Sequence, residues 1–250
     1  MDLQIDGHAV VVTGASRGLG AAMVRSLVAE GAVVLAAARS MDALKSLAAE
    51  TPGRVLPVAC DMRDRDAVAE LVDTCLAEFG RLDAVVNNAG IAPAGKLVET
   101  DLAVMEETMA VNLLAPAALA RAAAIHWIEV GQPGSVVNVA SISGLKGKAL
   151  LAGYSASKGA MMRLTEALSN EWARYQIRVN TIAPGGFATE AQAAVLGDPV
   201  TLEARLRKIP ARRMADPKEI GPLTGYLVSP LSGFVTGSCF VIDGGEVARL

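Results

Sequence analysis

The chain has 250 residues, and 23 Lys and Arg against 26 Asp and Glu give a formal net charge of −3 at pH 7. Hydrophobic residues make up 52% of the sequence and charged residues 20%, a composition that excludes a disordered chain, a collagen and a coiled coil. The slight negative charge also argues against a nucleic-acid-binding protein, because such proteins present a basic surface to phosphate groups. A chain of this length can bury one substantial core.

The cysteines and the hydropathy of the chain bear on its compartment. Cys60, Cys75 and Cys239 are too few and too scattered for a disulfide framework, and no CxxC spacing predicts a metal site, so a reducing compartment is expected. The N-terminus is acidic and reaches glycine too soon for a signal peptide. The uncharged stretch 220–242 contains two prolines and four glycines, which favour a helix, a turn and a strand over a membrane span. We expect a cytoplasmic protein that does not enter a membrane.

Apolar runs of strand length alternate with helix-periodic segments, a pattern that predicts an α/β fold built from βαβ units. The expected strands span 8–13, 33–38, 54–59, 82–87, 134–140, 177–182 and 238–242. The expected helices span 19–30, 64–79, 102–130, 154–174 and 217–229. Because no linker or repeat interrupts the alternation, one domain over residues 1–250 is expected. The segment 186–213 fits neither a strand nor a tight connection, and loops of that length are usually lids or binding loops.

The first chemical signal is TGASRGLG at residues 13–20, between the first expected strand and the first expected helix. Gly14 permits a sharp turn, Gly18 lets the backbone approach a pyrophosphate, and Gly20 lets the helix pack tightly on the strand. Free N–H groups and the positive dipole end at the start of a helix also favour a phosphate. The spacing GxxxGxG differs from the usual GxGxxG, and a glycine-rich turn without a ligand is the alternative.

Tyr154 and Lys158 are four residues apart in an expected helix and therefore share one face of it. A free tyrosine has a pKa of about 10, so a nearby cation is needed to favour the phenolate near neutral pH. Among the three tyrosines, Tyr154 alone has a basic residue four positions later. The alternative is a surface tyrosine beside a solvated lysine.

Further polar residues adjoin the expected strand ends. Ser141 follows the strand 134–140, where ligands bind in open α/β sheets, although a capping role or the use of Ser143 instead is the alternative. The run NNAG, residues 87–90, ends another strand, and Asn112 interrupts an apolar helical run. Such an asparagine either makes a structural hydrogen bond or serves a site, and periodicity does not separate the two roles.

Taken in order, these motifs resemble the short-chain dehydrogenase/reductase family, from Gly7 to the final VIDGG at 241–245. The resemblance rests on TGASRGLG, NNAG, VNLL around Asn112, Ser141, YSASK and RVNTIAPGG. It implies a single-domain, Rossmann-type, doubly wound parallel sheet of about seven strands with helices on both faces. It also implies a bound nicotinamide dinucleotide and, commonly, a homotetramer.

The resemblance assigns roles to individual residues. Tyr154 is the expected general acid/base, and Lys158 is expected to lower the pKa of Tyr154 and to bind the nicotinamide ribose. Ser141 is expected to orient the substrate oxygen, and Asn112 to hold a proton-relay water. The family pattern further places adenine against Asp61 and Met62 and the nicotinamide end against the loop after the sixth strand. The expected dinucleotide-binding residues are Gly14, Ser16, Arg17, Gly18, Leu19, Gly20, Arg39, Asp61, Met62, Asn88, Ala89, Gly90, Tyr154, Lys158, Pro184, Gly185, Phe187 and Thr189.

The end of the second strand bears on the choice of cofactor. Enzymes that prefer NAD usually place an acidic residue there, but this chain has Ala38 followed by Arg39. Arg17 lies within the glycine loop, so two arginines, with Ser16 in support, can bind a 2′-phosphate through charge-assisted hydrogen bonds. The sequence therefore predicts NADP(H) as the preferred cofactor, with NAD(H) as the alternative if Arg39 is a solvated loop residue.

The resemblance implies an oxidoreductase that interconverts a carbonyl and a secondary alcohol on a small molecule. The expected substrate is a 3-oxoacyl thioester, but the run IPARRMADPKEI is equally similar to segments of sugar-acid and polyol dehydrogenases. A dinucleotide-binding sensor without catalysis is the alternative of a different class, and the complete Ser, Tyr, Lys and Asn set argues against it. Five basic residues of the segment 186–213 can attract a carboxylate, a phosphate or an acidic carrier protein, or can form a solvated helix face: Arg205, Arg207, Lys208, Arg212 and Arg213.

Overall fold

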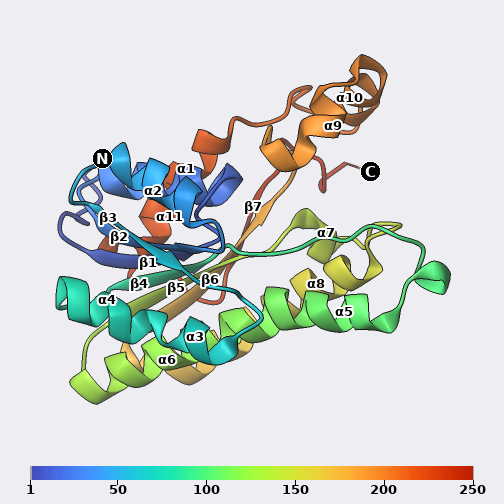
Figure 1. Cartoon of the computed structure of the whole chain (residues 1–250). Coiled ribbons are helices and arrows are strands. Elements are labelled where there is room, and N and C mark those ends of the chain that lie inside the picture. Colours follow the sequence, from blue (N-terminus) through green and yellow to red (C-terminus); the bar gives the residue numbers. More distant parts are fainter. Residues whose placement is uncertain (1, 250) are drawn as a thin grey trace.

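The computed structural model of this chain describes residues 2–249 and contains a seven-stranded sheet (Figure 1). All neighbouring strands pair in parallel, in the order β3-β2-β1-β4-β5-β6-β7. The predicted α/β class and the predicted doubly wound sheet are therefore confirmed. The strands are β1 (Ala9–Thr13), β2 (Val33–Ala38), β3 (Val55–Ala59), β4 (Ala84–Asn87), β5 (Gly134–Val139), β6 (Ile177–Pro184) and β7 (Cys239–Ile242).

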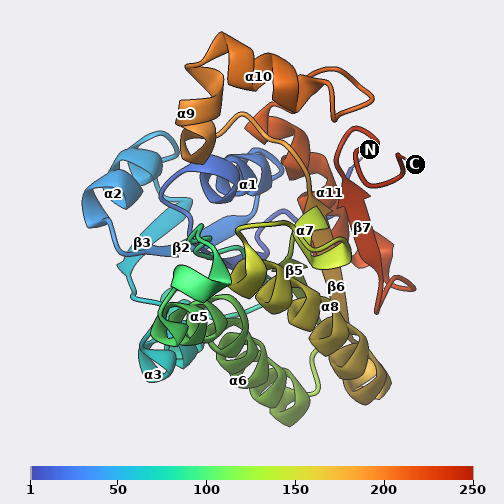
Figure 2. The same cartoon turned by 90° about the vertical axis from the view of Figure 1, so that its right-hand side faces the viewer.

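Helices cover both faces of the sheet, as Figures 1 and 2 show. One face carries α1 (Gly18–Ala29), α2 (Met41–Ala49) and α11 (Gly221–Val228). The other face carries α3 (Arg65–Ala69), α4 (Leu71–Phe79), α5 (Leu102–Met109), α6 (Ala115–Val130) and α8 (Ala152–Trp172). Three short helices, α7 (Ile142–Leu145), α9 (Ala193–Leu196) and α10 (Pro199–Leu206), lie beyond the carboxyl ends of the strands. Single 3-10 turns occupy Leu97–Glu99, Ala173–Tyr175, Glu190–Gln192, Pro217–Ile220 and Pro230–Ser232.

Some helix boundaries differ from the sequence-based expectation. The expected helix 102–130 contains a π-helical turn at Ala110–Leu114, which holds Asn112. π-helical turns of this kind are frequent at functional sites because one extra residue redirects the neighbouring side chains. The nine-residue helix α2 was not predicted, although Ser40 before it and Asp42 in its first turn are helix-start signals.

The strands are apolar on both faces because helices bury both. Along β1, Val10 and Val12 pack under α1, whereas Ala9 and Val11 pack on the side of α4 and α6. All four side chains are fully buried. This arrangement accounts for the continuous apolar runs in the sequence. Strands of a sheet with one solvent-exposed face would instead alternate apolar and polar residues.

The helical stretch Leu102–Val130 is, within residues 2–249, the one stretch long and apolar enough to cross a membrane by length and composition. Half of its most apolar window is buried inside the molecule. Leu119, Ala123 and Trp127 on α6 are fully buried within the apolar cluster beneath the sheet. A core helix meets the same criteria, and this packing accounts for the composition of the stretch.

The strand order creates a crevice between β1 and β4. The chain leaves β1 toward β2 and β3 on one side, and it continues from β4 toward β5, β6 and β7 on the other side. In open α/β sheets, ligands bind at this switch point, outside the carboxyl ends of the strands. The segment 186–213 rises from the same edge, where Phe187 and Ala215 form an isolated parallel bridge at its base.

Gly134, the first residue of β5, lies where α6 packs closely on the sheet. A Cβ atom at Gly134 would overlap the indole ring of Trp127, whose Nε1–H donates to the carbonyl of Leu82 at 2.7 Å. Because this ring is fully buried, we expect Gly134→Ala to destabilise the protein by roughly 1–3 kcal/mol. Gly147→Ala is the control, because a Cβ at Gly147 meets open space. Urea denaturation of both variants measures the effect, and equal midpoints would contradict it.

Candidate active site

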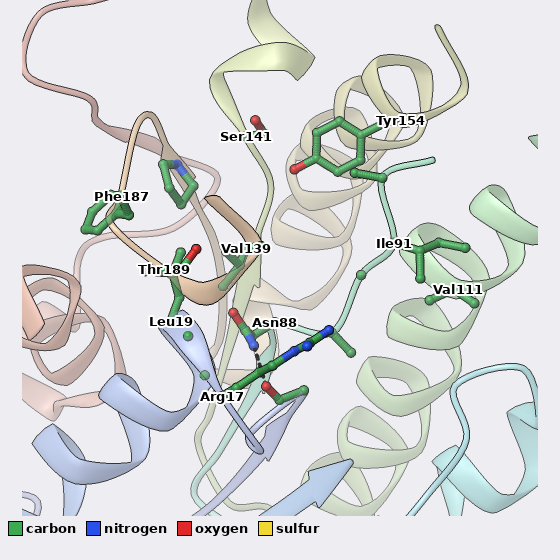
Figure 3. Close-up of a pocket in the computed structure, with 18 of the residues that line it drawn as sticks. Arg17, Leu19, Asn88, Ile91, Val111, Val139, Ser141, Tyr154, Phe187 and Thr189 are labelled. Atoms are coloured by element: carbon green, nitrogen blue, oxygen red, sulfur yellow. Dashed lines mark hydrogen bonds between the residues drawn. The ribbon is translucent and has the colours of Figure 1, made fainter. Parts of the chain in front are cut away.

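A cavity of about 890 Å³ lies at the carboxyl edge of the sheet (Figure 3). It is lined by residues that follow β1, β2, β3, β4, β5 and β6, together with residues of α8 and α10. Among the residues predicted for the site, Asn112 alone does not line this cavity. The predicted residues that line it are Gly14, Ser16, Arg17, Gly18, Leu19, Gly20, Arg39, Asp61, Met62, Asn88, Ala89, Gly90, Ser141, Tyr154, Lys158, Pro184, Gly185, Phe187 and Thr189.

The glycine loop provides a cradle for a phosphate. Gly14 has a φ of +64°, and a Cβ there would lie 2.8 Å from the Cα of Ala89, so the position requires glycine. α1 begins at Gly18, and the side chain of the preceding Arg17 makes no cap hydrogen bond. The first N–H groups of this twelve-residue helix are therefore available at the cavity wall, which suits an anion such as a pyrophosphate. These residues fit a dinucleotide.

The loop after β4 is tied to the glycine loop by Thr13. The Thr13 hydroxyl accepts hydrogen bonds from the backbone N–H groups of Asn88 and Ala89, each at 3.1 Å. In return, the Asn88 amide donates to the carbonyls of Thr13 at 2.9 Å and Gly14 at 3.2 Å. The Asn88 side chain therefore positions the loops, and its NH₂ group is already used. The role of Thr13 was missed from the sequence, although its place at the end of β1 is the signal that could have found it.

Asn112 acts on the loop after β4 from the π-helical turn. Its Oδ1 accepts from the N–H of Ile91 at 2.8 Å, and its Nδ2 donates to the carbonyl of Ile91 at 2.9 Å. Nδ2 also donates to the hydroxyl of Ser157 at 3.0 Å. The side chain is fully buried, so its amide is committed to holding this loop beside α8. The relay-water role implied by the resemblance stays a prediction, and the structure shows a positioning role.

Ser141 and Tyr154 meet because α7 packs directly on α8. A Cβ at Gly144 would lie 2.7 Å from the backbone carbon of Lys158, so a side chain there would push the two helices apart. The hydroxyl of Ser141 accepts from the N–H of Ser143 at 3.1 Å and lies close enough to the Tyr154 hydroxyl to affect its pKa. Figure 3 shows Ser141 and Tyr154 directed into the same part of the cavity. Ser143 lines the cavity as well, but its N–H serves to orient Ser141.

Lys158 lies beneath Tyr154 and is 3% exposed. Its Nζ donates to the carbonyl of Val139 at 2.7 Å and lies 5.8 Å from the centre of the Tyr154 ring. Burial lowers the pKa of Lys158 to about 8, so the amine is still mostly cationic at pH 7. Burial raises the pKa of Tyr154, and the nearby Ser141 hydroxyl opposes that rise. The net direction for Tyr154 is therefore opposite to the expected lowering, because desolvation of the phenolate is the larger effect.

The far end of the cavity carries three arginines. Arg39 follows Ala38 at the end of β2, Arg17 lies in the glycine loop after β1, and both line the cavity and are exposed. Asp61 is bound by Arg63, with Nη2 at 2.5 Å and Nε at 3.1 Å, and this pairing lowers the pKa of Asp61 to about 2. Arg63 was missed from the sequence, although its spacing two residues after Asp61 is the signal that permits this pairing.

The near end of the cavity is formed by the loop after β6 and the C-terminal tail. A Cβ at Gly185 would lie 2.8 Å from the Cα of Asp243, so glycine allows the two backbones to touch. The Asp243 carboxylate in turn accepts from the N–H groups of Gly245 at 2.8 Å and Val247 at 2.6 Å. Asp243 thereby fixes the course of the tail beside the loop that carries Phe187.

Burial of Lys158 generates a prediction about pH. Its pKa in the folded protein is about 8 against an ordinary value of 10.5, so between these values the folded state binds fewer protons than the unfolded state. The contribution of Lys158 to the free energy of unfolding must then rise with pH across that range. We expect the stability of the wild type relative to Lys158→Met to increase from pH 8 to pH 10.

Denaturation at several pH values measures this difference. Lys45→Met is the control, because Lys45 is exposed on α2. A wild-type advantage that stays constant or decreases with pH for the Lys158 variant would contradict the burial of a charged amine.

Comparisons with known proteins agree with this geometry. A family model described as enoyl-(acyl carrier protein) reductase matches residues 14–246. The chain is 38% identical to cis-4-hydroxycyclohexanecarboxylate dehydrogenase of Sinomonas cyclohexanicum, over 95% of this chain and 96% of that protein. It is 33% identical to the 3-oxoacyl-(acyl-carrier-protein) reductase of Thermotoga maritima, over 98% of this chain and 100% of that protein.

A solved structure from Agrobacterium tumefaciens, assigned as a 2-deoxy-d-gluconate 3-dehydrogenase with bound NADP, superposes with a TM-score of 0.92. That protein is 34% identical, and the match covers 99% of each chain. The glycine loop, the NNAG run and the Ser, Tyr and Lys set thus occur in a chain that matches these enzymes along its whole length. The chain belongs to the short-chain dehydrogenase/reductase family of oxidoreductases.

Proposed function

We propose that this protein is an NADP(H)-dependent oxidoreductase that interconverts a carbonyl and a secondary alcohol, with Tyr154 as general acid/base. The observation that carries the proposal is the meeting of Tyr154, Ser141 and Lys158 in the same cavity as the glycine loop. A dinucleotide held by the glycine loop would share this cavity with the Tyr154 phenol, so hydride transfer at the substrate carbon and proton transfer at its oxygen could occur in one site.

The bound nicotinamide supplies the hydride acceptor or donor for the substrate carbon. Tyr154 gives a proton to the substrate oxygen during reduction and takes it during oxidation. Ser141 donates a hydrogen bond to the same oxygen and so stabilises the charge that develops there. Lys158 keeps a cationic amine beneath the phenol at neutral pH, which favours the phenolate when the proton leaves. Asn112 keeps the loop after β4 in place beside this set.

The preference for NADP(H) rests on the charge at the far end of the cavity. Arg17 and Arg39 are exposed there, and Ala38 stands where enzymes that prefer NAD place a carboxylate. A 2′-phosphate bound between two guanidinium groups gains charge-assisted hydrogen bonds. The Agrobacterium relative with bound NADP supports the same choice.

The relatives support two substrate classes. The Thermotoga relative supports a 3-oxoacyl thioester, and the Agrobacterium and Sinomonas relatives support a small hydroxy acid. A dinucleotide-binding sensor without turnover is disfavoured, because a sensor has no need of the buried cation beneath Tyr154. The homotetramer and the cytoplasmic location implied by the resemblance stay predictions.

The phenol is tested by Tyr154→Phe. We expect this variant to lose turnover in both directions while it keeps the Kd for NADPH nearly unchanged, since it lacks only the hydroxyl. Tyr175→Phe is the control, because Tyr175 lies on the surface at the end of α8 and pairs with Arg174. Initial rates with NADPH over a panel of ketones, 3-oxoacyl thioesters and keto-sugar acids measure the loss, and fluorescence titration measures the Kd. Appreciable residual turnover would refute the assignment.

The cofactor preference is tested by kcat/KM for NADPH against NADH. We expect NADPH to be favoured in the wild type, and Arg39→Ala to reduce that preference roughly tenfold through loss of one charge-assisted contact. Arg25→Ala is the control, because Arg25 is exposed on α1 and pairs with Glu50 away from the cavity. Equal or NADH-favouring values in the wild type would reject the proposal.

A further inference from the structure

The near end of the cavity contains a cation that the reaction described above does not use. Arg205 of α10 lines the cavity, whereas the other four basic residues of the segment 186–213 do not. Its side chain is 17% exposed, against 70% for Arg207 on the same helix. Arg207 and Arg213 are paired at the surface with Glu203 and Glu219, which is the solvated arrangement. Arg205 is thus the residue of this set that is turned toward the ligand space.

Arg205 is held by one carboxylate of the C-terminal tail. Its Nη1 and Nη2 donate to Oε1 and Oε2 of Glu246 at 2.5 Å and 2.6 Å, and Glu246 also lines the cavity. A guanidinium presents five N–H groups, of which Glu246 takes two. Within residues 2–249, no other hydrogen bond to the Arg205 side chain occurs. The remaining N–H groups and the charge are therefore available to a second anion, or to one that replaces Glu246.

The Arg205–Glu246 pair lines the same cavity as Ser141 and Tyr154. A Cβ at Gly186 would lie 3.0 Å from Nη2 of Arg205, so the guanidinium rests on the loop after β6. Next to Glu246 in the tail, the carbonyl of Val247 accepts from Nζ of Lys146 at 2.6 Å, and this bond ties the tail to the end of α7. Ser141 is the N-cap residue at the other end of α7. Figure 2 shows α10, α7 and the C-terminus around this end of the molecule.

We propose that Arg205 binds a carboxylate of the substrate and that Glu246 is an internal carboxylate that competes for it. The substrate is then a small hydroxy acid and its oxo counterpart, whereas a simple 3-oxoacyl chain carries no carboxylate for this site to bind. The inference rests on the proposed oxidoreductase activity. Arginine suits the role because its planar fork binds carboxylates through two parallel hydrogen bonds.

The ion pair has an alternative, purely structural role, which we call a latch: it could hold α10 against the C-terminal tail. A latch would act on every substrate alike, because it holds the cavity wall whatever the cavity contains. A carboxylate site acts only on charged substrates. Removal of the Glu246 carboxylate distinguishes the two roles further, since it weakens a latch but frees Arg205 to bind a substrate carboxylate.

The experiment compares cis-4-hydroxycyclohexanecarboxylate with its carboxamide, which share a ring and an alcohol but differ in charge. The measured quantity is the ratio of kcat/KM for the acid to kcat/KM for the amide, with NADP⁺ in excess. We expect Arg205→Met to lower this ratio roughly tenfold or more, because a charge-assisted hydrogen bond is lost. We expect Glu246→Gln to raise the ratio, and Arg207→Met, with a matched surface ion pair, to leave it as in the wild type.

An equal loss for acid and amide in Arg205→Met, or a lower ratio in Glu246→Gln, would overturn the proposal in favour of the latch. An effect confined to the KM of NADP⁺ would also overturn it, by assigning Arg205 to the dinucleotide. Melting temperatures of all three variants show whether they fold.

A binding measurement keeps this inference separate from the proposed activity. Calorimetric titration of the NADP⁺ complex with cyclohexanecarboxylate and with cyclohexanecarboxamide needs no turnover. We expect the carboxylate to bind more tightly to the wild type and this advantage to disappear in Arg205→Met. If the advantage is present while no substrate is turned over, the proposed activity fails and the carboxylate site stands. If the wild type and Arg205→Met bind the carboxylate equally tightly, the carboxylate site fails.

Discussion

The hydrogen bond from Lys158 to the carbonyl of Val139 is the constraint on which the site depends. It joins α8 to the last residue of β5, and so it joins the helix that carries Tyr154 to the strand that leads into Ser141. The amine is almost fully buried, and burial lowers its pKa because desolvation disfavours the charged form. A neutral apolar residue would pack there with less desolvation, but it could not place a cation beneath the phenol.

A ladder of buried polar side chains reinforces the same joint between strands and helix. The Asn87 amide donates to Oδ1 of Asn138 at 2.9 Å, and Nδ2 of Asn138 donates to the hydroxyl of Thr165 on α8 at 2.9 Å. The hydroxyl of Thr181 donates to that of Thr165 at 2.8 Å. Because Asn87, Asn138 and Thr181 stand in register on β4, β5 and β6, the ladder runs across the sheet beneath the site. Buried and paired groups of this kind fix one arrangement of the helix on the sheet.

The charges of the cavity are separated along its length. Arg17 lies in the glycine loop after β1, Arg39 and Arg63 follow β2 and β3, Lys158 lies on α8, and Arg205 lies on α10. The cations differ in how far they are exposed to water, and exposure determines which anions each of them can reach. The exposed arginines can attract an anion from solution, whereas the buried amine acts only on the group directly above it. Arg205 is intermediate, because Glu246 neutralises it until another carboxylate arrives.

Hydrophobic periodicity in the sequence determined the fold class, and the motifs that resemble the short-chain dehydrogenase/reductase family indicated the glycine cradle and the Ser141, Tyr154 and Lys158 set. Tertiary structure decided the rest, since the relevant partners are far apart in the chain. The Asn112 amide is committed to Ile91 through a π-helical turn that periodicity does not reveal. Of the five basic residues in one segment, packing against Gly186 and pairing with Glu246 turned Arg205 alone toward the cavity. Sequence spacing states which charges are present, but burial and long-range pairing determine which of them a ligand can meet.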